Sequence, residues 1–419
     1  MSQFHDQVRD RFIRYAKINT ESQAGSPTAP STMRQFDLAR LLAAELKEMG
    51  VQNVRLTDKC CIYGVIPATV EKEDVYTVGF IAHMDTTPDA SGENVKPWVL
   101  EGYDGGDVVL NTEKNIILKT ADFPNMKKYV GDDMIFSDGT TLLGGDDKAS
   151  VAAMMTAAEY LCRHPEIQHG PICIGFTPDE EVGRGTENFD IKEFGADLAY
   201  TLDGSGIGGI YEETFNAWEA QLTIHGINVH PGVAKGVMVN AVEIAGEFMQ
   251  MLPGRERPQF TEGREGYYHP FVLNATVENA FIRCLIRDHD LDSYYARKAT
   301  IEECVNKLNE KYGEGTVELD WVNQYFNMGE VIKKVPFMIT YAEEAIRRAG
   351  LEPWQEAMRG GTDGAWLSQA GLPCPNITAG YENAHGHFEC VSIQSMEKNV
   401  DILIELVRIY EENAGAEKR

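Results

Sequence analysis

A repeated alternation of short, continuous apolar runs with helical patterns constrains this fold more than any other feature. Three such runs are VYTVGFIAH at 75–83, PICIGFTP at 171–178 and LAYTLDG at 198–204, and the helical pattern ASVAAMMTAAEYLCRH lies at 149–164. A strand that is apolar on both sides belongs in a sheet that is covered on both faces. The pattern therefore predicts an α/β fold with a mixed, mostly parallel sheet and helices on both of its faces.

A further helix is expected after the polar loop near the N-terminus. MRQFDLARLLAAELKEMG at 33–50 has helical periodicity and ends on Gly50, a residue type common after helix C-termini. Ser31 or Thr32 is expected to cap the start of this helix, because a hydroxyl oxygen can accept a hydrogen bond from an unpaired backbone N–H.

The pattern changes from about Thr214, where strands and helices follow in the order β-α-β-β-α-β. The strands are expected at 216–226, 271–279, 280–288 and 316–322, and the helices at 237–252 and 293–313. This order is that of a ferredoxin-like α+β unit. Because 419 residues exceed one ordinary core, we expect two domains. Residues 1–213 and 325–419 form the first, and 214–324 form an insertion into it.

The charge and the cysteines limit the kinds of partner and compartment. The formal net charge is −27, which disfavours binding to nucleic acid and to anionic membranes. The acidic residues are scattered over predicted helix surfaces. The eight cysteines form no C-x-x-C pair, and several lie in apolar runs, as expected in a reducing compartment. Without a signal-peptide pattern or an apolar run of ~20 residues, we expect a cytoplasmic protein.

Two predicted strands end on residues that suit metal binding. His83 and Asp85 are two apart in an extended segment and so share one face. Asp85 can therefore orient a metal-bound imidazole, although a simple His–Asp pair that stabilises a loop fits equally well. Asp203 ends the strand at 198–204, where an Asx-turn is the alternative.

Two acidic pairs extend the pattern. Glu180 and Glu181 follow the strand at 171–178, and neighbouring side chains of an extended chain point to opposite sides. One can bind metal while the other faces a substrate. Asp146 and Asp147 follow two glycines and precede a helix, where Asp is also a favoured capping and turn residue.

A histidine-containing loop near the C-terminus, AHGHFECV, completes the set with His385 and His387. Glu389, four residues after His385, can orient the loop. Three carboxylates, two neutral imidazoles and a bridging hydroxide nearly balance two divalent ions, and this donor set suits zinc. Two such ions can activate a bridging water, and a spare glutamate can take its proton. The chain has no G-x-S-x-G, Walker A or H-E-x-x-H motif.

Seven segments together resemble the peptidase T family, the tripeptide aminopeptidases of the dizinc aminoacylase/carboxypeptidase clan. They are AHMDTTPD, DGTTLLGGDDKAS, FTPDEEVGRG, YTLDGSG, INVHPGVAKGVMVNA, MRGGTDGAWLS and GLPCPN, in the order of the family from about residue 20 to 400. The resemblance implies a zinc-dependent aminopeptidase that releases the N-terminal residue of short peptides, with tripeptides as the expected substrates.

The resemblance also implies the role of each site residue. Five ligands hold two Zn²⁺ ions per subunit: His83 and Asp203 on one ion, Glu181 and His385 on the other, and Asp146 bridging them. Glu180 is the general base for the metal-activated water, and Asp85 orients His83. The Asp146–Asp147 peptide is commonly cis in the clan.

Three residues outside the metal cluster are implied to bind substrate. The insertion acts as a lid and dimerisation domain of a homodimer, and its His230 stabilises the oxyanion, with Asn240 as a further substrate contact. Arg359 pairs with the C-terminal carboxylate of the peptide. The residues alone favour simpler roles: a loop residue for His230, a helix cap for Asn240 and an ion pair with Asp363 for Arg359.

The chain departs from the family pattern at Gly145, Ser150 and His387. These departures bear on substrate preference more than on chemistry. A dipeptidase, a carboxypeptidase or an N-acyl amino acid deacylase of the same clan is the nearest alternative. A non-catalytic peptide-binding protein is an alternative from a different functional class, and the intact Glu180 argues against it.

Overall fold

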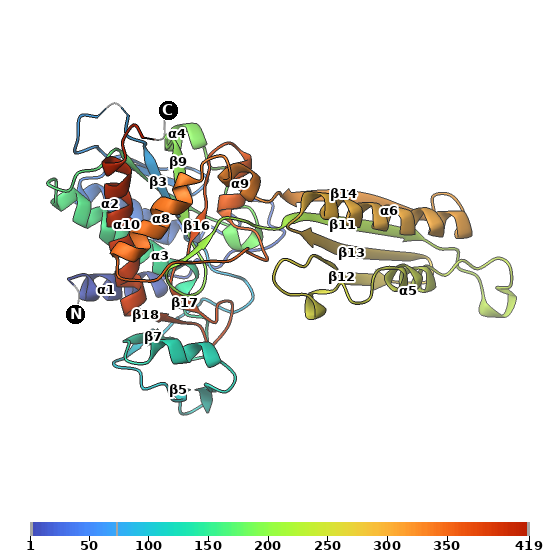
Figure 1. Cartoon of the computed structure of the whole chain (residues 1–419). Coiled ribbons are helices and arrows are strands. Elements are labelled where there is room, and N and C mark those ends of the chain that lie inside the picture. The colour runs from blue at the N-terminus through green and yellow to red at the C-terminus, as the bar shows by residue number, and fades with distance from the viewer. Residues whose placement is uncertain (1–2, 73, 417–419) are drawn as a thin grey trace. The chain divides into compact units, whose positions relative to one another are not determined.

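The computed structural model describes residues 3–72 and 74–416, which form two compact units (Figure 1). The first unit comprises Met1–Glu212, Glu330–Glu356 and Thr362–Arg419, and the second comprises Glu213–Gly329 and Ala357–Gly361. The short segment Ala357–Gly361, which carries Arg359, thus groups with the second unit.

The first unit is built on an eight-stranded sheet of order β1-β2-β8-β3-β9-β16-β10-β15. Its strands are β1 (Gln52–Leu56), β2 (Ile62–Ile66), β8 (Ile172–Thr177), β3 (Val78–His83), β9 (Leu198–Leu202), β16 (Asn376–Ile377), β10 (Gly209–Tyr211) and β15 (Trp354–Gln355). β8, β3, β9 and β16 run parallel, while β2 pairs antiparallel with β8. Every residue of β3, β8 and β9 is buried. The predicted mixed, mostly parallel sheet is confirmed.

Helices pack on both faces of this sheet (Figure 1). α4 (Ile191–Phe194) and α9 (Asp363–Gln369) share a core with Ile81, Cys173 and Ala199. The remaining helices of the unit are α1 (His5–Ala16), α2 (Gln35–Met49), α3 (Gly145–Arg163), α8 (Phe337–Arg348) and α10 (Ile393–Glu412), with the short α7 (Gly329–Ile332) at the unit boundary.

The start of α2 differs from the prediction, whereas its end agrees. Gly50 follows the helix in the left-handed conformation with φ 95°, as expected of a glycine cap. The predicted cap by Ser31 or Thr32 is wrong, because α2 begins at Gln35 after Arg34, without a side-chain cap. The Ser31 side chain instead contacts Asp179.

Two small antiparallel sheets complete the first unit, and the sequence patterns did not identify them. One contains β17 (Tyr381–Glu382), β18 (Cys390–Ser392), β7 (Met134–Phe136) and β4 (Trp98–Leu100), and the other pairs β5 (Val108–Asn111) with β6 (Ile116–Leu118). Strands of two to four residues are too short to show a period. β17 and β18 flank the loop that carries His385.

The second unit has the predicted element order: β11 (Asn216–His225), α5 (Ala241–Met251), β12 (Tyr267–Ala275), β13 (Asn279–Asp288), α6 (Leu291–Tyr312) and β14 (Val317–Tyr325). The sheet order is β12-β13-β11-β14 and every pairing is antiparallel. Alternate residues of β11 and β13 are buried in one core with the two helices. The ferredoxin-like unit is therefore confirmed.

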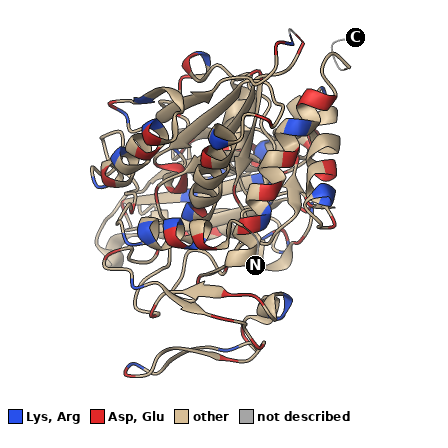
Figure 2. Cartoon of the chain, turned by 90° about the vertical axis from the view of Figure 1, so that its left-hand side faces the viewer, with Lys and Arg blue, Asp and Glu red and all other residues tan. Residues whose placement is uncertain are grey.

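Figure 2 shows acidic and basic residues interspersed along the helices of the first unit on the side that faces the viewer. Among the described residues, none of the helices has the length and apolar character needed to span a bilayer.

Candidate metal centre

The candidate metal centre lies where three neighbouring strands end. His83 is the last residue of β3, Asp203 directly follows β9, and β8 leads through Asp179 into a 3₁₀ turn at Glu180–Val182. Because β8, β3 and β9 are adjacent and parallel, their carboxyl ends meet at one edge of the sheet. The core strands therefore place the predicted residues of three separate segments together.

Asp146 lies between the two histidines of the predicted ligand set. Its Oδ1 is 3.0 Å from His83 Nε2, and its Oδ2 is 3.4 Å from His385 Nε2. Asp146 belongs to the first turn of α3, and the Asp146–Asp147 peptide bond is cis, as the resemblance implied. One carboxylate oxygen thus points to each histidine.

Asp85 connects His83 to the paired glutamates. The Asp85 carbonyl oxygen is 3.1 Å from His83 Nδ1, and the Asp85 carboxylate is 3.4 Å from the same nitrogen. The fully buried carboxylate also accepts hydrogen bonds from the backbone N–H groups of Glu180, at 3.0 Å, and Glu181, at 3.2 Å. Asp85 therefore holds the turn that carries both glutamates.

His385 joins the cluster from the loop between β17 and β18. Its Nε2 is 2.9 Å from Glu181 Oε2, and its Nδ1 is 3.4 Å from Asp89 Oδ2. The backbone of His385 has a positive φ of 63°, which marks a sharp turn of the chain at this residue. Of the two loop histidines, His385 makes these contacts.

Three overlapping sets of residues bring potential ligand atoms within 4.8 Å of one another: His83 with Glu180 and Asp203, His83 with Asp146 and Glu181, and Asp146 with Asp147 and Asp203. Glu181 Oε1 and Asp147 Oδ1 are buried without a hydrogen-bond partner among the described residues. Unpaired buried carboxylate oxygens are costly. Each of these residues belongs to one of the three sets, where a cation would offset that cost. Imidazole nitrogens and carboxylate oxygens are the ligands that zinc accepts. The residues therefore fit a metal site.

The pKa shifts of the clustered side chains also indicate a cation site. Burial and the Asp146 carboxylate raise the pKa of Glu181 to about 8 and that of Asp203 to about 6. Burial also raises the pKa of Glu180 well above its ordinary value. Hydrogen bonds to Asp146 and Glu181 raise the pKa of His385 to about 11. The carboxylates repel one another and draw protons to the site, so a bound cation would lower the energy of their charged forms.

Two further residues support the proposed ligands: Tyr381, which the sequence analysis did not identify, and Glu389, which it identified only in part. The buried Tyr381 hydroxyl donates to Asp203 Oδ1 at 2.7 Å and accepts from the Gly204 N–H at 2.9 Å. No sequence pattern marks it. Glu389, noted only for its spacing from His385, accepts a hydrogen bond from the Asp146 N–H at 2.8 Å.

His230 and Asn240, two of the predicted substrate contacts, lie in the second unit. His230 is exposed, and its Nδ1 accepts from the Gly232 N–H at 3.1 Å. Asn240 caps α5, with its Oδ1 accepting from the Val242 N–H at 3.0 Å. The simpler roles considered for both residues are thus present, and their roles toward substrate stay predictions.

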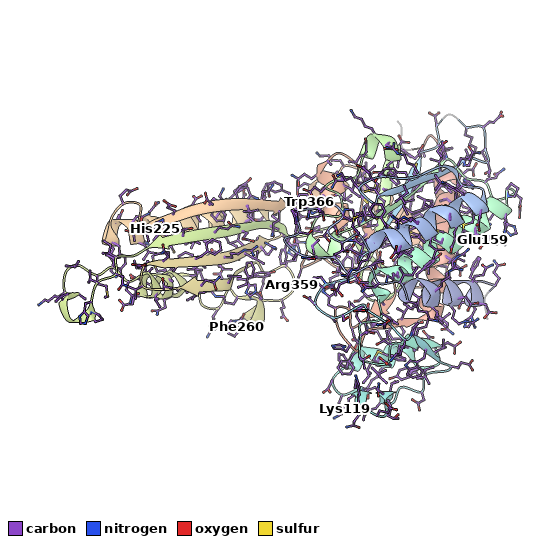
Figure 3. The ribbon with its side chains drawn as sticks, turned by 180° about the vertical axis from the view of Figure 1, so that it is seen from behind. Lys119, Glu159, His225, Phe260, Arg359 and Trp366 are labelled. Atoms are coloured by element: carbon purple, nitrogen blue, oxygen red, sulfur yellow. The ribbon has the colours of Figure 1, made fainter. Side chains whose placement is uncertain are left out.

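Arg359 is anchored within the second unit (Figure 3). Its Nη1 donates to the carbonyl oxygens of Gly263 and Glu265 at 2.7 and 2.8 Å, and its guanidinium carbon lies 5.2 Å from the ring centre of Phe215. Asp363, the partner considered from sequence, instead accepts from the Thr177 hydroxyl at 2.6 Å.

Similarity to known proteins agrees with this geometry. Residues 138–409 match the model of peptidase family M20/M25/M40. The chain is 48% identical over 406 residues to peptidase T of Geobacillus kaustophilus, covering 97% of this chain and 98% of that relative. Crystal structures of aminopeptidase PepT from Bacillus cereus and of a tripeptidase from Staphylococcus aureus share the fold. Each is 21% identical and covers 97% of this chain, with 98% and 99% of their own chains matched and TM-scores of 0.75 and 0.77. The chain therefore belongs to the peptidase T group of peptidase family M20/M25/M40.

Proposed function

We propose that the protein is an aminopeptidase that removes the N-terminal residue of short peptides, with tripeptides as its substrates and two Zn²⁺ ions per subunit. One observation carries the proposal: His83 and a set of buried or half-buried carboxylates, Glu180 among them, converge at the strand ends, and His385 contacts two of these carboxylates from its loop. Membership of the peptidase T group supports the reaction.

The proposed ligands are His83 and Asp203 for one ion, Glu181 and His385 for the other, and Asp146 between them. The division of the Asp146 oxygens between the two histidines, at 3.0 and 3.4 Å, supports a bridging role. Bound there, the two ions would lower the pKa of water and polarise the scissile carbonyl group.

Glu180 is the proposed proton carrier. Its raised pKa, caused by burial, suits a carboxylate that takes a proton from the attacking water and gives it to the leaving amine. The hydrogen bond from its backbone N–H to Asp85 orients the residue. Asp85 also holds the imidazole of His83 through Nδ1.

The second unit is proposed to act as the lid and the dimerisation domain of a homodimer. In this proposal His230 stabilises the oxyanion, Asn240 contacts the substrate and Arg359 binds the C-terminal carboxylate of the peptide. The guanidinium group of Arg359 can donate two parallel hydrogen bonds to a carboxylate. Binding both ends of the peptide would favour short substrates. The eight free cysteines support a cytoplasmic location.

The test is Glu180→Ala, with the exposed Glu48→Ala on α2 as the matched control. We expect the Glu180 variant to keep its zinc and to lose about 10²–10⁴-fold in turnover of tripeptides, while the control keeps the wild-type rate. Products from di-, tri- and tetrapeptides and from acyl amino acids are measured on the same preparation. Cleavage of acyl amino acids alone would overturn the aminopeptidase proposal.

A further inference from the structure

The polar loop between α1 and α2 contacts the segments that carry the candidate site. The Ile18 carbonyl oxygen accepts a hydrogen bond from Lys148 Nζ at 2.8 Å, next to the Asp146–Asp147 turn. The Ser22 N–H donates to the Thr86 carbonyl at 3.0 Å, next to Asp85. The loop therefore touches two of the segments that converge at the strand ends.

The third contact is made by Asp179, the residue before Glu180. Its carboxylate accepts hydrogen bonds from the Ser31 N–H at 2.6 Å, the Ser31 hydroxyl at 2.5 Å and Gln35 Nε2 at 2.6 Å. The Asp179 N–H donates to Gln35 Oε1 at 3.2 Å. Asp179 is only 2% exposed, and Ser31 and Gln35 are buried as well. Charge-assisted hydrogen bonds in a buried setting hold their partners tightly.

The backbone around Asp179 is held as firmly as its side chain. Asp179 has a left-handed φ of 60°, a conformation that costs energy for a residue with a side chain unless its surroundings impose it. Its carbonyl oxygen accepts from the Arg184 N–H at 2.9 Å. On the other side, the Glu180 N–H is held by the Asp85 carboxylate. Two buried carboxylates thus fix the chain where it enters Glu180.

We propose that Asp179 is a positioning residue that sets the location of Glu180 through Ser31 and Gln35. The proposal rests on the role of Glu180 as proton carrier given above. A proton carrier acts only within hydrogen-bond reach of its partners, and a displacement of about 1 Å can cost about 10²-fold in rate. A loop that is remote in sequence would then control the efficiency of proton transfer.

The test is Asp179→Asn, which keeps the size of the side chain and replaces one acceptor oxygen by a donor. We expect kcat for a tripeptide to fall about 10²-fold, with KM and zinc content close to wild type. The melting temperature should fall, because a buried donor loses its acceptor, but it should stay above the assay temperature. The matched control is Asp190→Asn, an exposed Asp in the same connection that caps α4. The control should keep the wild-type kcat.

A positioning role differs from a structural one in its dependence on Glu180. When Glu180 is already alanine, Asp179→Asn should reduce the residual rate no further, because both changes remove the same step. Adding Gln35→Glu to Asp179→Asn should restore kcat, since the introduced carboxylate would accept from the introduced amide. Ser31→Ala, which removes one donor only, should give a smaller loss of kcat and keeps the proposal testable if Asp179→Asn does not fold.

Three results would overturn the proposal: wild-type kcat in the folded Asp179 variant, an equal further loss in the Glu180→Ala background, or a loss of rate that follows the loss of zinc. The proposed function is tested separately, because full activity of Glu180→Ala would show that Glu180 is not the proton carrier. An inactive Glu180→Ala beside a fully active Asp179→Asn would refute only the positioning role.

Discussion

The Glu389 carboxylate accepts a hydrogen bond from the backbone N–H of Asp146 at 2.8 Å. The same carboxylate accepts from the N–H groups of Leu143 and Gly144 at 2.8 and 2.7 Å. Glu389 is buried and lies four residues after His385. One carboxylate therefore ties the loop of one proposed ligand to the helix start that carries another.

Glu389→Gln should weaken zinc binding without unfolding the protein. The substitution leaves at least one of the three N–H donors facing an amide group that cannot accept, so the turn at Asp146 loosens. Changes to groups that orient metal ligands typically cost about 10–100-fold in affinity. Competition with a chelator measures the affinity. Glu412→Gln at the end of α10 is the control, and equal affinity in both variants would contradict the prediction.

Tyr381→Phe should affect the ion at Asp203. Removal of the hydroxyl leaves Asp203 Oδ1 without its 2.7 Å donor and the Gly204 N–H without its acceptor. We expect zinc analysis after dialysis against a chelator to show the loss of one ion per subunit before the other. Tyr200→Phe, which removes a buried hydroxyl bonded to Tyr410, should lower the melting temperature and keep both ions. Parallel loss of both ions from Tyr381→Phe would argue against this assignment.

Zinc should raise the melting temperature of metal-free protein. The buried oxygen of Glu181 that has no partner among the described residues is destabilising until a cation is bound. Zinc at 100 times its Kd would add about 2.7 kcal/mol to the free energy of unfolding. Differential scanning fluorimetry measures the shift. Asp146→Asn should reduce it, and the absence of a shift in the wild type would count against the metal centre.

The strand ends could be predicted from sequence, whereas the residues that support them could not. His83, Glu181 and Asp203 lie at or just after the ends of buried strands, and continuous apolar runs mark such strands without knowledge of tertiary contacts. Parallel neighbours then bring their ends together. The resemblance to a family added the role of His385, which no periodic pattern places near Asp146.

Tyr381 and Asp179 depend on contacts that local patterns do not encode. Tyr381 reaches Asp203 across 178 residues of sequence, and Asp179 reaches Ser31 across 148. Local rules assigned Ser31 to the cap of α2, because hydroxyls commonly cap helices. A buried carboxylate binds the same hydroxyl instead. Long-range pairing therefore decided the role of a residue for which local propensity suggested another.

The stability of the protein should fall in mild acid because of His169. This side chain is fully buried, its Nδ1 is 2.7 Å from the Gly170 carbonyl oxygen, and burial lowers its pKa. The unfolded chain, with a pKa of about 6.5, then binds more protons than the folded one. The contribution of His169 to stability is complete above about pH 6.5 and is lost as the pH falls through the lower folded pKa.

His169→Gln should make the drop in melting temperature between about pH 7 and pH 5 smaller than in the wild type. Other titrating groups are common to both proteins, so the difference isolates His169. An unchanged drop in the His169 variant would contradict the prediction.

Arg359 should discriminate between peptides with a free and a blocked C-terminus. Its Nη1 and Nη2 donate to Gly263, Glu265 and Thr261, which holds the guanidinium plane in place before any substrate arrives. If this group pairs with the peptide carboxylate, Arg359→Ala should raise KM for a tripeptide by at least about tenfold, equivalent to about 1.4 kcal/mol. KM for the C-terminal amide of the same tripeptide should hardly change, since the amide carries no charge to pair.

Arg359→Lys keeps the charge but loses the paired donors of the guanidinium group, so its KM for the free acid should lie between those of the wild type and Arg359→Ala. Equal effects of Arg359→Ala on the acid and the amide would show that Arg359 acts only by holding the loop at residues 261–265.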